Sequence, residues 1–155
     1  MRKISKAVIV GLGNIAYRHR KNLKILFPEI FIIATPSTGK VLNQNLEFVD
    51  QIILTLEEVI KEKVDIAIVA SPAPFHKIHV KTFLLAGIPC LVEKPVTGNS
   101  RDAQELIRIS KKTNTPTAVG YCLRYIPSSI KMKELIEKGI IGNVYNAFVS
   151  GGQYL

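Results

Sequence analysis

The chain has 155 residues, of which 47% are hydrophobic, so it can bury a core without disulfide bonds and intrinsic disorder is excluded. Every apolar run is interrupted well before the roughly 20 residues that a membrane span requires, so no membrane partner is expected. The only cysteines, Cys90 and Cys122, lie far apart and form no metal-binding or redox pair. This usage favours a cytoplasmic location and no metal site.

The charge of the chain is strongly positive, with 21 Lys and Arg against 12 Asp and Glu, or +9 net. Three explanations are open: a nucleic acid, an anionic cofactor or substrate, or an acidic partner. The basic residues are scattered along the chain and no basic run is interleaved with aromatic residues. We therefore expect no nucleic-acid partner and interpret most of these charges as solvated helix faces.

Short β-branched runs alternate with amphipathic segments along most of the chain, which predicts an α/β fold. Strands are expected at residues 7–10, 30–34, 51–54, 65–70, 90–92 and 117–120. Helices are expected at residues 14–26, 55–63, 74–86, from 100 onward and 127–138. Strands this apolar are typical of a doubly wound parallel sheet with helices on both faces.

Two segments fit this alternation poorly. Residues 36–50 are polar and turn-rich, so we expect at most one short helix where a full crossover helix would normally lie. Residues 146–150 are predicted as a further strand, and the Gly-Gly that follows does not resemble a natural terminus.

A glycine-rich turn, Gly11-Leu12-Gly13-Asn14-Ile15-Ala16, connects the first strand to the first helix. G-x-G-x-x-G/A at this position binds dinucleotides. The first glycine permits a tight turn and the second lets a pyrophosphate approach the backbone, where the helix amides of Asn14 and Ile15 can meet it. The alternative is an ordinary glycine turn.

The end of the second strand lacks the Asp or Glu that usually binds the adenine ribose. Ser37, Thr38 and Lys40 occupy this stretch, and their hydroxyls and ammonium group are suited to a 2′-phosphate. NADP is therefore slightly favoured over NAD, although Arg is the more usual phosphate ligand. An ordinary turn with a solvated Lys40 is the alternative.

Ser71, Pro72 and His76 follow the fourth strand, at the edge of the sheet where ligands of such folds bind. His76 and His79 are spaced i, i+3, but no other metal ligands accompany them. We therefore expect surface or helix-capping positions for the two histidines and no metal.

Glu93-Lys94-Pro95 follows the fifth strand and is the strongest candidate for catalysis. Hydride transfer from an alcohol needs a group that takes the hydroxyl proton, and Lys94 is suited to this role. A strand-end salt bridge is the alternative. Arg124, after the sixth strand, is a candidate for binding an anionic or polyhydroxylated substrate, or else a solvent-exposed arginine.

The order of these motifs resembles the glucose-fructose oxidoreductase and inositol dehydrogenase (Gfo/Idh/MocA) family over nearly the whole chain. The motifs are Gly11 to Ala16, Ser71-Pro72 with His76, Glu93-Lys94-Pro95, and Gly120-Tyr121 with Arg124-Tyr125. The resemblance implies an NAD(P)-dependent oxidoreductase of sugars, polyols or their derivatives. It also implies that Lys94 lies near the reacting hydroxyl, that Glu93 holds the nicotinamide ribose, and that the segment from Pro72 to His76 lines the nicotinamide end.

The same resemblance implies a Rossmann domain over residues 1–120, then a connecting helix and the start of a second domain over residues 121–155. The family's large antiparallel sheet, with its D-x-x-x-H element, is not present in the sequence. We thus expect cofactor binding without turnover by this chain alone; a non-catalytic dinucleotide-sensing module is the alternative, and a homo-oligomer is possible. Expected cofactor contacts are Gly11, Gly13, Asn14, Ile15, Ser37, Thr38, Lys40, Ser71, Pro72, His76, Glu93, Lys94 and Pro95; expected substrate contacts are Lys94 and Arg124.

Overall fold

The computed structural model describes residues 4–40 and 46–152. The backbone contacts divide the chain into two units, Met1–Gly120 and Tyr121–Leu155.

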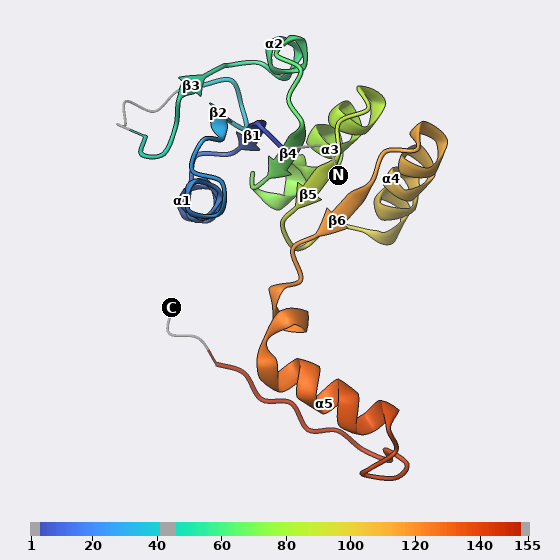
Figure 1. The fold of residues 1–155 in the computed structure, drawn as a ribbon. Helices are drawn as coiled ribbons and strands as arrows, with labels where there is room; N and C mark the ends of the chain where they lie inside the picture. The colour runs from blue at the N-terminus through green and yellow to red at the C-terminus, as the bar shows by residue number, and fades with distance from the viewer. Residues whose placement is uncertain (1–3, 41–45, 153–155) are drawn as a thin grey trace. The chain divides into compact units, whose positions relative to one another are not determined.

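A six-stranded parallel sheet forms the first unit, in the order β3-β2-β1-β4-β5-β6 (Figure 1). Its strands are β1 (Lys6–Val10), β2 (Phe31–Thr35), β3 (Gln51–Ile52), β4 (Ile66–Val69), β5 (Cys90–Val92) and β6 (Thr117–Val119). The chain runs outward from β1 in one direction to β3 and then from β4 in the other direction to β6. This order confirms the predicted doubly wound α/β fold and creates a switch point between β1 and β4.

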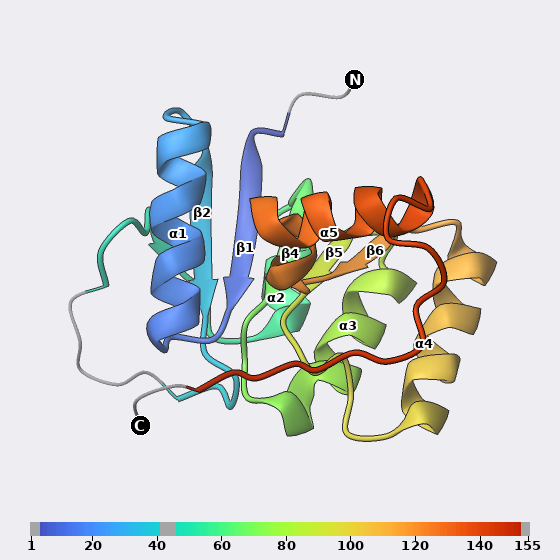
Figure 2. The same cartoon turned by 90° about the horizontal axis from the view of Figure 1, so that it is seen from below.

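Helices cover both faces of the sheet. They are α1 (Asn14–Leu26), α2 (Leu56–Lys61), α3 (His76–Leu85) and α4 (Ser100–Thr113). In Figure 1, α1 lies on one side of the row of strands and α2, α3 and α4 lie on the other. Figure 2 shows α1 running along β1 and β2.

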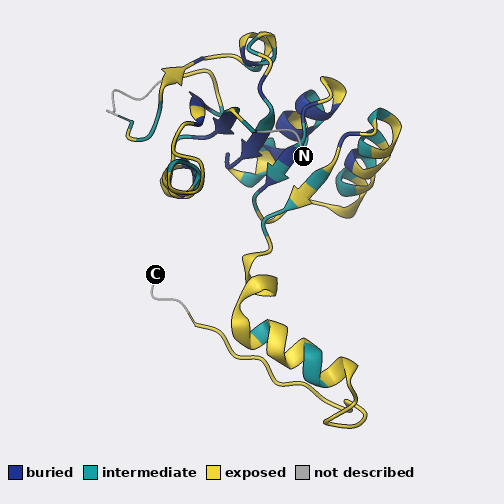
Figure 3. Cartoon of the chain, viewed as in Figure 1, coloured by how far each residue is buried: buried dark blue, intermediate teal, exposed yellow. Residues whose placement is uncertain are grey.

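The core follows from the two-residue period of a strand. Ala7 and Ile9 belong to the apolar cluster on the α1 side, whereas Val8 and Val10 belong to the larger cluster under α2, α3 and α4. All of them are fully buried, which explains the unbroken apolar run (Figure 3). Cys90 lies in the larger cluster, where burial raises the pKa of its thiol to about 12, while Cys122 is exposed.

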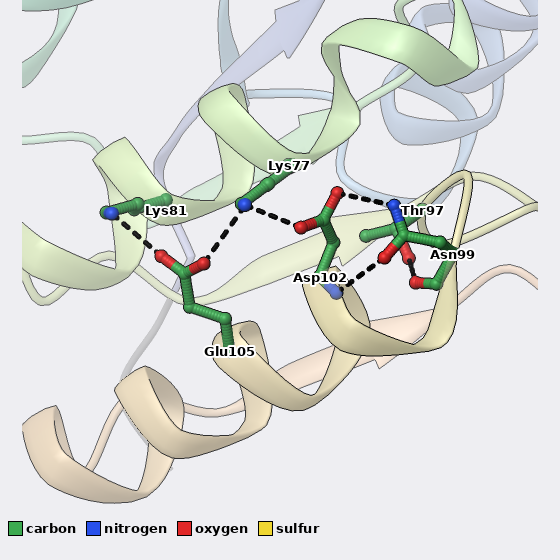
Figure 4. Close-up of polar contacts among 6 residues, drawn as sticks. All are labelled: Lys77, Lys81, Thr97, Asn99, Asp102 and Glu105. Carbon is green, nitrogen blue, oxygen red and sulfur yellow. Dashed lines mark hydrogen bonds and ion pairs between the residues drawn. The ribbon is translucent and has the colours of Figure 1, made fainter.

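Ion pairs join α3 to α4 on the outside of the sheet (Figure 4). Lys77 Nζ lies 2.6 Å from an Asp102 oxygen and 3.0 Å from a Glu105 oxygen, and Lys81 Nζ lies 2.8 Å from the other Glu105 oxygen. Asn99 caps α4, because its Oδ1 accepts a hydrogen bond from the Asp102 amide at 2.9 Å. The helix cap and the interhelical ion pairs therefore share Asp102.

The described part of the connection between β2 and β3 contains no helix, where at most one short helix was expected. Its described residues, 36–40 and 46–50, form turns and bends, and residues 41–45 lie outside the described part of the chain. Arg20 is buried and donates from Nε to the Glu47 carbonyl at 3.1 Å, so α1 holds this segment by a polar contact. β3 is also shorter than the predicted strand at 51–54, because its parallel pairing with β2 extends over only two residue pairs.

The second unit contains a short 3-10 helix, η2 (Cys122–Tyr125), and the helix α5 (Pro127–Glu137). The prediction of a strand at residues 146–150 is wrong, since this segment has no regular structure. A strand requires a partner for its backbone hydrogen bonds, and no strand occurs among residues 121–152. Nowhere in the described chain is a helix long and apolar enough to span a membrane.

Candidate cofactor-binding site

The glycine loop lies at the switch point, between the ends of β2 and β4. Gly11 has φ +109°, and its amide donates to the Thr35 carbonyl at 2.8 Å. A Cβ at Gly11 would lie 2.6 Å from the Ala70 carbonyl oxygen. Both the backbone conformation and the close approach of β4 therefore require glycine at this position.

Gly13 differs from Gly11 because a Cβ there would meet no atom within 4 Å. Its conformation, φ −78° and ψ −173°, is open to any residue, and it occupies the N-cap of α1. The first-turn amides of Asn14 and Ile15 have no carbonyl partner within their own helix, and no acidic residue neutralises this turn. Space, amide donors and a positive helix end thus coincide, which fits a pyrophosphate.

The glycine loop forms part of a groove of about 710 Å³, which is within the usual range for ligand sites of roughly 300–1,000 Å³. Three loops, which follow β1, β2 and β4, supply its walls. The lining residues are Gly11 to Ile15, Pro36, Ser37, Thr38, Lys40, Ala70, Ser71 and Pro72. Nine of the thirteen expected cofactor contacts are therefore brought together in one groove: Gly11, Gly13, Asn14, Ile15, Ser37, Thr38, Lys40, Ser71 and Pro72.

None of the described residues on the β2 side of the groove carries a carboxylate. Thr35 ends β2, is fully buried, and its hydroxyl has no hydrogen-bond partner among the described residues. Thr38 and Lys40 are exposed, and Ser37 is half-buried. This wall offers hydroxyl groups and a cation to a ligand.

A second polar cluster surrounds Glu93, directly after β5. Its Oε1 lies 2.8 Å from His19 Nε2, and its Oε2 accepts the Lys94 amide at 3.3 Å. A Cβ at Gly120 would lie 3.2 Å from Glu93 Oε1, so the carboxylate lies tightly against the end of β6. Lys94 itself is exposed, and its ammonium has no ion-pair partner in the described part of the chain.

His19 is a site residue that the sequence analysis missed. It follows Ile15, a residue of the glycine loop, by four positions, so helical periodicity places it one turn beyond the groove on the same side of α1. That spacing was the available signal, but its acidic partner lies 74 residues away in the sequence.

His76 connects the groove to the Glu93 cluster. Its Nε2 lies 2.7 Å from the Ser71 carbonyl, and its Nδ1 lies 2.7 Å from the Pro95 carbonyl. The expected surface position is wrong for both histidines, because His76 is 1% exposed and His79 is 5% exposed, although His76 does lie at a helix end, as the first residue of α3. The apolar face of α3 packs on the sheet and carries both rings inward. Both nitrogens of His76 face backbone carbonyls, so this side chain joins two loops.

His79 lies beneath the β4 loop. Its Nδ1 is 2.9 Å from Ser71 Oγ, and its ring stacks on Phe75 with centroids 6.0 Å apart. Burial lowers the pKa of His79, as does the nearby His76 ring, while a hydrogen bond with the Ser37 backbone opposes this shift. His79 therefore contacts both outer walls of the groove.

Arg124 belongs to the second unit. There it lines a surface hollow with Leu123, Tyr125, Ser129 and Lys133. Among the described residues, no group of three or more His, Cys, Asp or Glu side chains could hold a metal ion.

A parallel sheet of this order, with a glycine loop and a groove at its switch point, defines a dinucleotide-binding domain of the Rossmann class. Residues 5–121 match the Gfo/Idh/MocA oxidoreductase family, described by its NAD-binding Rossmann fold. The chain belongs to this family, as its motifs indicated.

Sugar and polyol dehydrogenases are among the relatives of the chain. The chain is 29% identical to inositol 2-dehydrogenase of Corynebacterium glutamicum over 89 residues, which are 57% of this chain and 26% of that protein. It is 32% identical over 123 residues to the D-xylose 1-dehydrogenase (NADP(+)) of Hypocrea jecorina, a match that covers 76% of this chain and 32% of that protein.

Among solved structures, scyllo-inositol dehydrogenase from Lactobacillus casei, with bound NAD(H) and scyllo-inositol, has the same fold with a TM-score of 0.79 at 23% identity. That match covers 91% of this chain and 43% of the dehydrogenase. The chain thus spans between about a quarter and less than half of these relatives' lengths.

Proposed function

We propose that the first unit binds NAD or NADP in the groove at the switch point, as part of an oxidoreductase of a sugar, polyol or sugar derivative. Hydride would pass from a hydroxyl-bearing carbon of the substrate to the cofactor, or in reverse from the reduced cofactor to the corresponding carbonyl carbon. The observation that carries this proposal is the glycine loop. Gly13 leaves open space directly in front of helix amides that have no partner within α1. A phosphate-containing ligand is the chemistry that such a helix end binds best.

The residues of the groove would contact two parts of the cofactor, the pyrophosphate and the adenine ribose. Asn14 and Ile15 amides would bind the pyrophosphate, and Ser37, Thr38 and Lys40 would surround the 2′-position of the adenine ribose. An acidic residue at this wall would repel a 2′-phosphate, and none of the described residues that line the groove is acidic. NADP is therefore slightly favoured over NAD. The xylose relative named with NADP(+) and the scyllo-inositol structure with NAD(H) leave both cofactors within the family's range.

The chemistry belongs to the Glu93 cluster. The nicotinamide ring supplies the hydride acceptor when the cofactor is bound. Glu93, oriented by His19, would accept a hydrogen bond from the nicotinamide ribose. Lys94 Nζ would exchange the proton of the reacting hydroxyl, and Pro95, tied to His76 through its carbonyl, would fix this turn. Arg124 is proposed as a substrate contact.

Titration of the chain with NADH and with NADPH tests the cofactor assignment directly. The nicotinamide fluorescence of each should respond to binding in the micromolar range, with NADPH bound the more tightly. Failure of both cofactors to bind at millimolar concentration would contradict the proposal.

A further inference from the structure

His79 is a buried polar residue with no role in the function proposed above. It lies in the first turn of α3, its Nδ1 is 2.9 Å from Ser71 Oγ, and Phe75 stacks on its ring. Ser71 is 6% exposed and lines the cofactor groove. The protonation state and tautomer of the His79 ring therefore decide whether the Ser71 hydroxyl donates or accepts a hydrogen bond toward a ligand.

The tautomer of His79 follows from its two hydrogen bonds. Burial lowers the pKa of His79, so the ring is neutral and has one N–H donor and one acceptor nitrogen. The hydrogen bond with the Ser37 backbone raises that pKa, as happens when a ring N–H donates to a carbonyl oxygen. The remaining nitrogen, which faces Ser71, is then the acceptor.

We propose that His79 is a positioning residue of the cofactor groove: its Nε2–H donates to the Ser37 carbonyl, and its Nδ1 accepts the Ser71 hydroxyl proton, so that Ser71 Oγ presents only lone pairs to the ligand. This role rests on the proposed function, because the ligand is the dinucleotide. His79 thereby joins the loop after β2 to the loop after β4, on the two sides of the β1 glycine loop.

The polarity of Ser71 has a consequence for recognition. A hydroxyl whose proton is already donated accepts a hydrogen bond from a ribose hydroxyl or a carboxamide N–H. It offers no donor to a phosphate oxygen, which itself only accepts. The phosphates are therefore bound by the backbone amides of the glycine loop, and Ser71 selects for a hydroxyl or amide group of the cofactor.

Nuclear magnetic resonance of the imidazole nitrogens tests the tautomer without any ligand. The chain has three histidines, so each ring signal can be assigned by its loss in a His→Asn variant. Two-bond proton–nitrogen spectra at neutral pH should show His79 with its proton on Nε2. A proton on Nδ1, or on both nitrogens, would overturn the inference.

Cofactor affinity tests the role. Ser71→Ala and His79→Leu should each weaken NADH binding roughly threefold to tenfold, which is the change in affinity expected from the loss of one neutral hydrogen bond. His79→Asn, whose amide oxygen can replace Nδ1 as acceptor, should recover most of the affinity lost in His79→Leu. Thr82→Val, which removes a hydroxyl bonded to Ile78 on the same helix, is the matched control and should bind as the wild type does.

The outcomes separate the two proposals. Unchanged NADH affinity in His79→Leu would overturn the role of His79 alone, whereas a wild-type chain that binds neither NADH nor NADPH would overturn the proposed function. Should His79→Leu fail to fold, Ser71→Ala and the tautomer spectrum of the wild type still decide: a Ser71→Ala chain that binds as tightly as the wild type contradicts the inference.

Discussion

His19 Nε2 lies 2.8 Å from Glu93 Oε1, so helix α1 reaches across the end of β4 to the end of β5. The glycine loop begins α1 and the Glu93 turn ends β5, and this contact joins them. Both side chains are largely buried, with 18% and 14% of their surfaces exposed. The fold therefore holds the glycine loop of the groove and the Glu93 cluster, where the reaction is proposed to occur, in a fixed relationship.

Glu93→Gln keeps the shape of the side chain and removes its charge. We expect NADH affinity to fall roughly tenfold, since a neutral hydrogen bond of about 0.5–1.5 kcal/mol would replace a hydrogen bond to a charged group of about 1.5–3 kcal/mol. ADP, which lacks the nicotinamide ribose, should bind unchanged. Calorimetric titration of both ligands measures this, with the exposed Glu29→Gln as control. Equal losses for NADH and ADP would mean that Glu93 acts only on the fold.

The two glycines of the loop should respond differently to substitution. Gly13→Asp provides a good N-cap residue, so the melting temperature should be kept, but its carboxylate would fill the phosphate space and NADH affinity should fall more than about 100-fold. Gly11→Ala should instead destabilise the fold by about 2–4 kcal/mol, because its φ is positive and its Cβ would overlap the Ala70 carbonyl. Thermal and urea unfolding, with NADH titration, distinguish the two effects. Retained NADH binding in Gly13→Asp would remove the glycine loop from the site.

Lys94→Met tests the position of the Lys94 ammonium without turnover. A cation near the nicotinamide repels the oxidised ring, which is positively charged, and not the reduced one. The substitution should therefore raise the affinity for NAD⁺ relative to NADH roughly two- to fivefold. Lys61→Met, an exposed lysine on α2, controls for the change in net charge. An unchanged ratio of the two affinities would indicate that Lys94 lies far from the ring.

Lys40→Gln tests the wall that follows β2. NADPH affinity should fall several-fold and become less dependent on salt, because one charge contact to the 2′-phosphate is lost. NADH affinity should stay the same. Lys61→Gln again serves as the charge-matched control. Equal effects on both cofactors would show that Lys40 acts through the general field of the chain and not through the 2′-phosphate.

The ion pairs between α3 and α4 make stability depend on pH. Hydrogen bonds from Lys81 and Lys77 lower the pKa of Glu105 from 4.5 to about 2. The ionised Glu105 carboxylate therefore stabilises the folded state. This stabilisation is fully present above pH 4.5 and is lost as the pH falls toward 2, because the protonated carboxyl no longer pairs with the two lysines. Glu105→Gln should lower the melting temperature at neutral pH, and the difference should narrow on acidification.

Salt provides a second check on the same ion pairs. In about 1 M NaCl, where the Debye length is roughly 3 Å, the difference between wild type and Glu105→Gln should also shrink. The exposed Glu29→Gln should show no such pattern. A difference that is constant across pH and salt would assign the effect of Glu105 to packing.

The sheet and the glycine loop could be predicted because their signals are local. The strands, the helix after Gly13 and the missing acid near Lys40 are all visible within short windows of sequence. The burial of His79 could not be predicted in this way, because the ring points inward only as a result of the packing of α3 on the sheet. The contact between His19 and Glu93 depends on the strand order, which no short window contains.

The predicted strand at residues 146–150 failed for a related reason. Alternating polarity and β-branched residues indicate that a segment prefers an extended conformation. The segment forms a strand only if a partner strand is available to pair with it. The sequence of residues 36–50 was also ambiguous. In the described part of this segment, Glu47 is held by a polar contact with Arg20, whereas a crossover helix would pack on the sheet through apolar residues.

The environments of the two cysteines make the chain suitable for site-selective labelling. Cys90 is buried with a thiol pKa of about 12, so its thiolate is scarce at neutral pH and maleimide reagents should not reach it. Cys122 is exposed and begins η2, just after the first unit ends. A single fluorophore can therefore be attached at the junction of the two units without any mutation, where it can report how that junction responds when a dinucleotide is added.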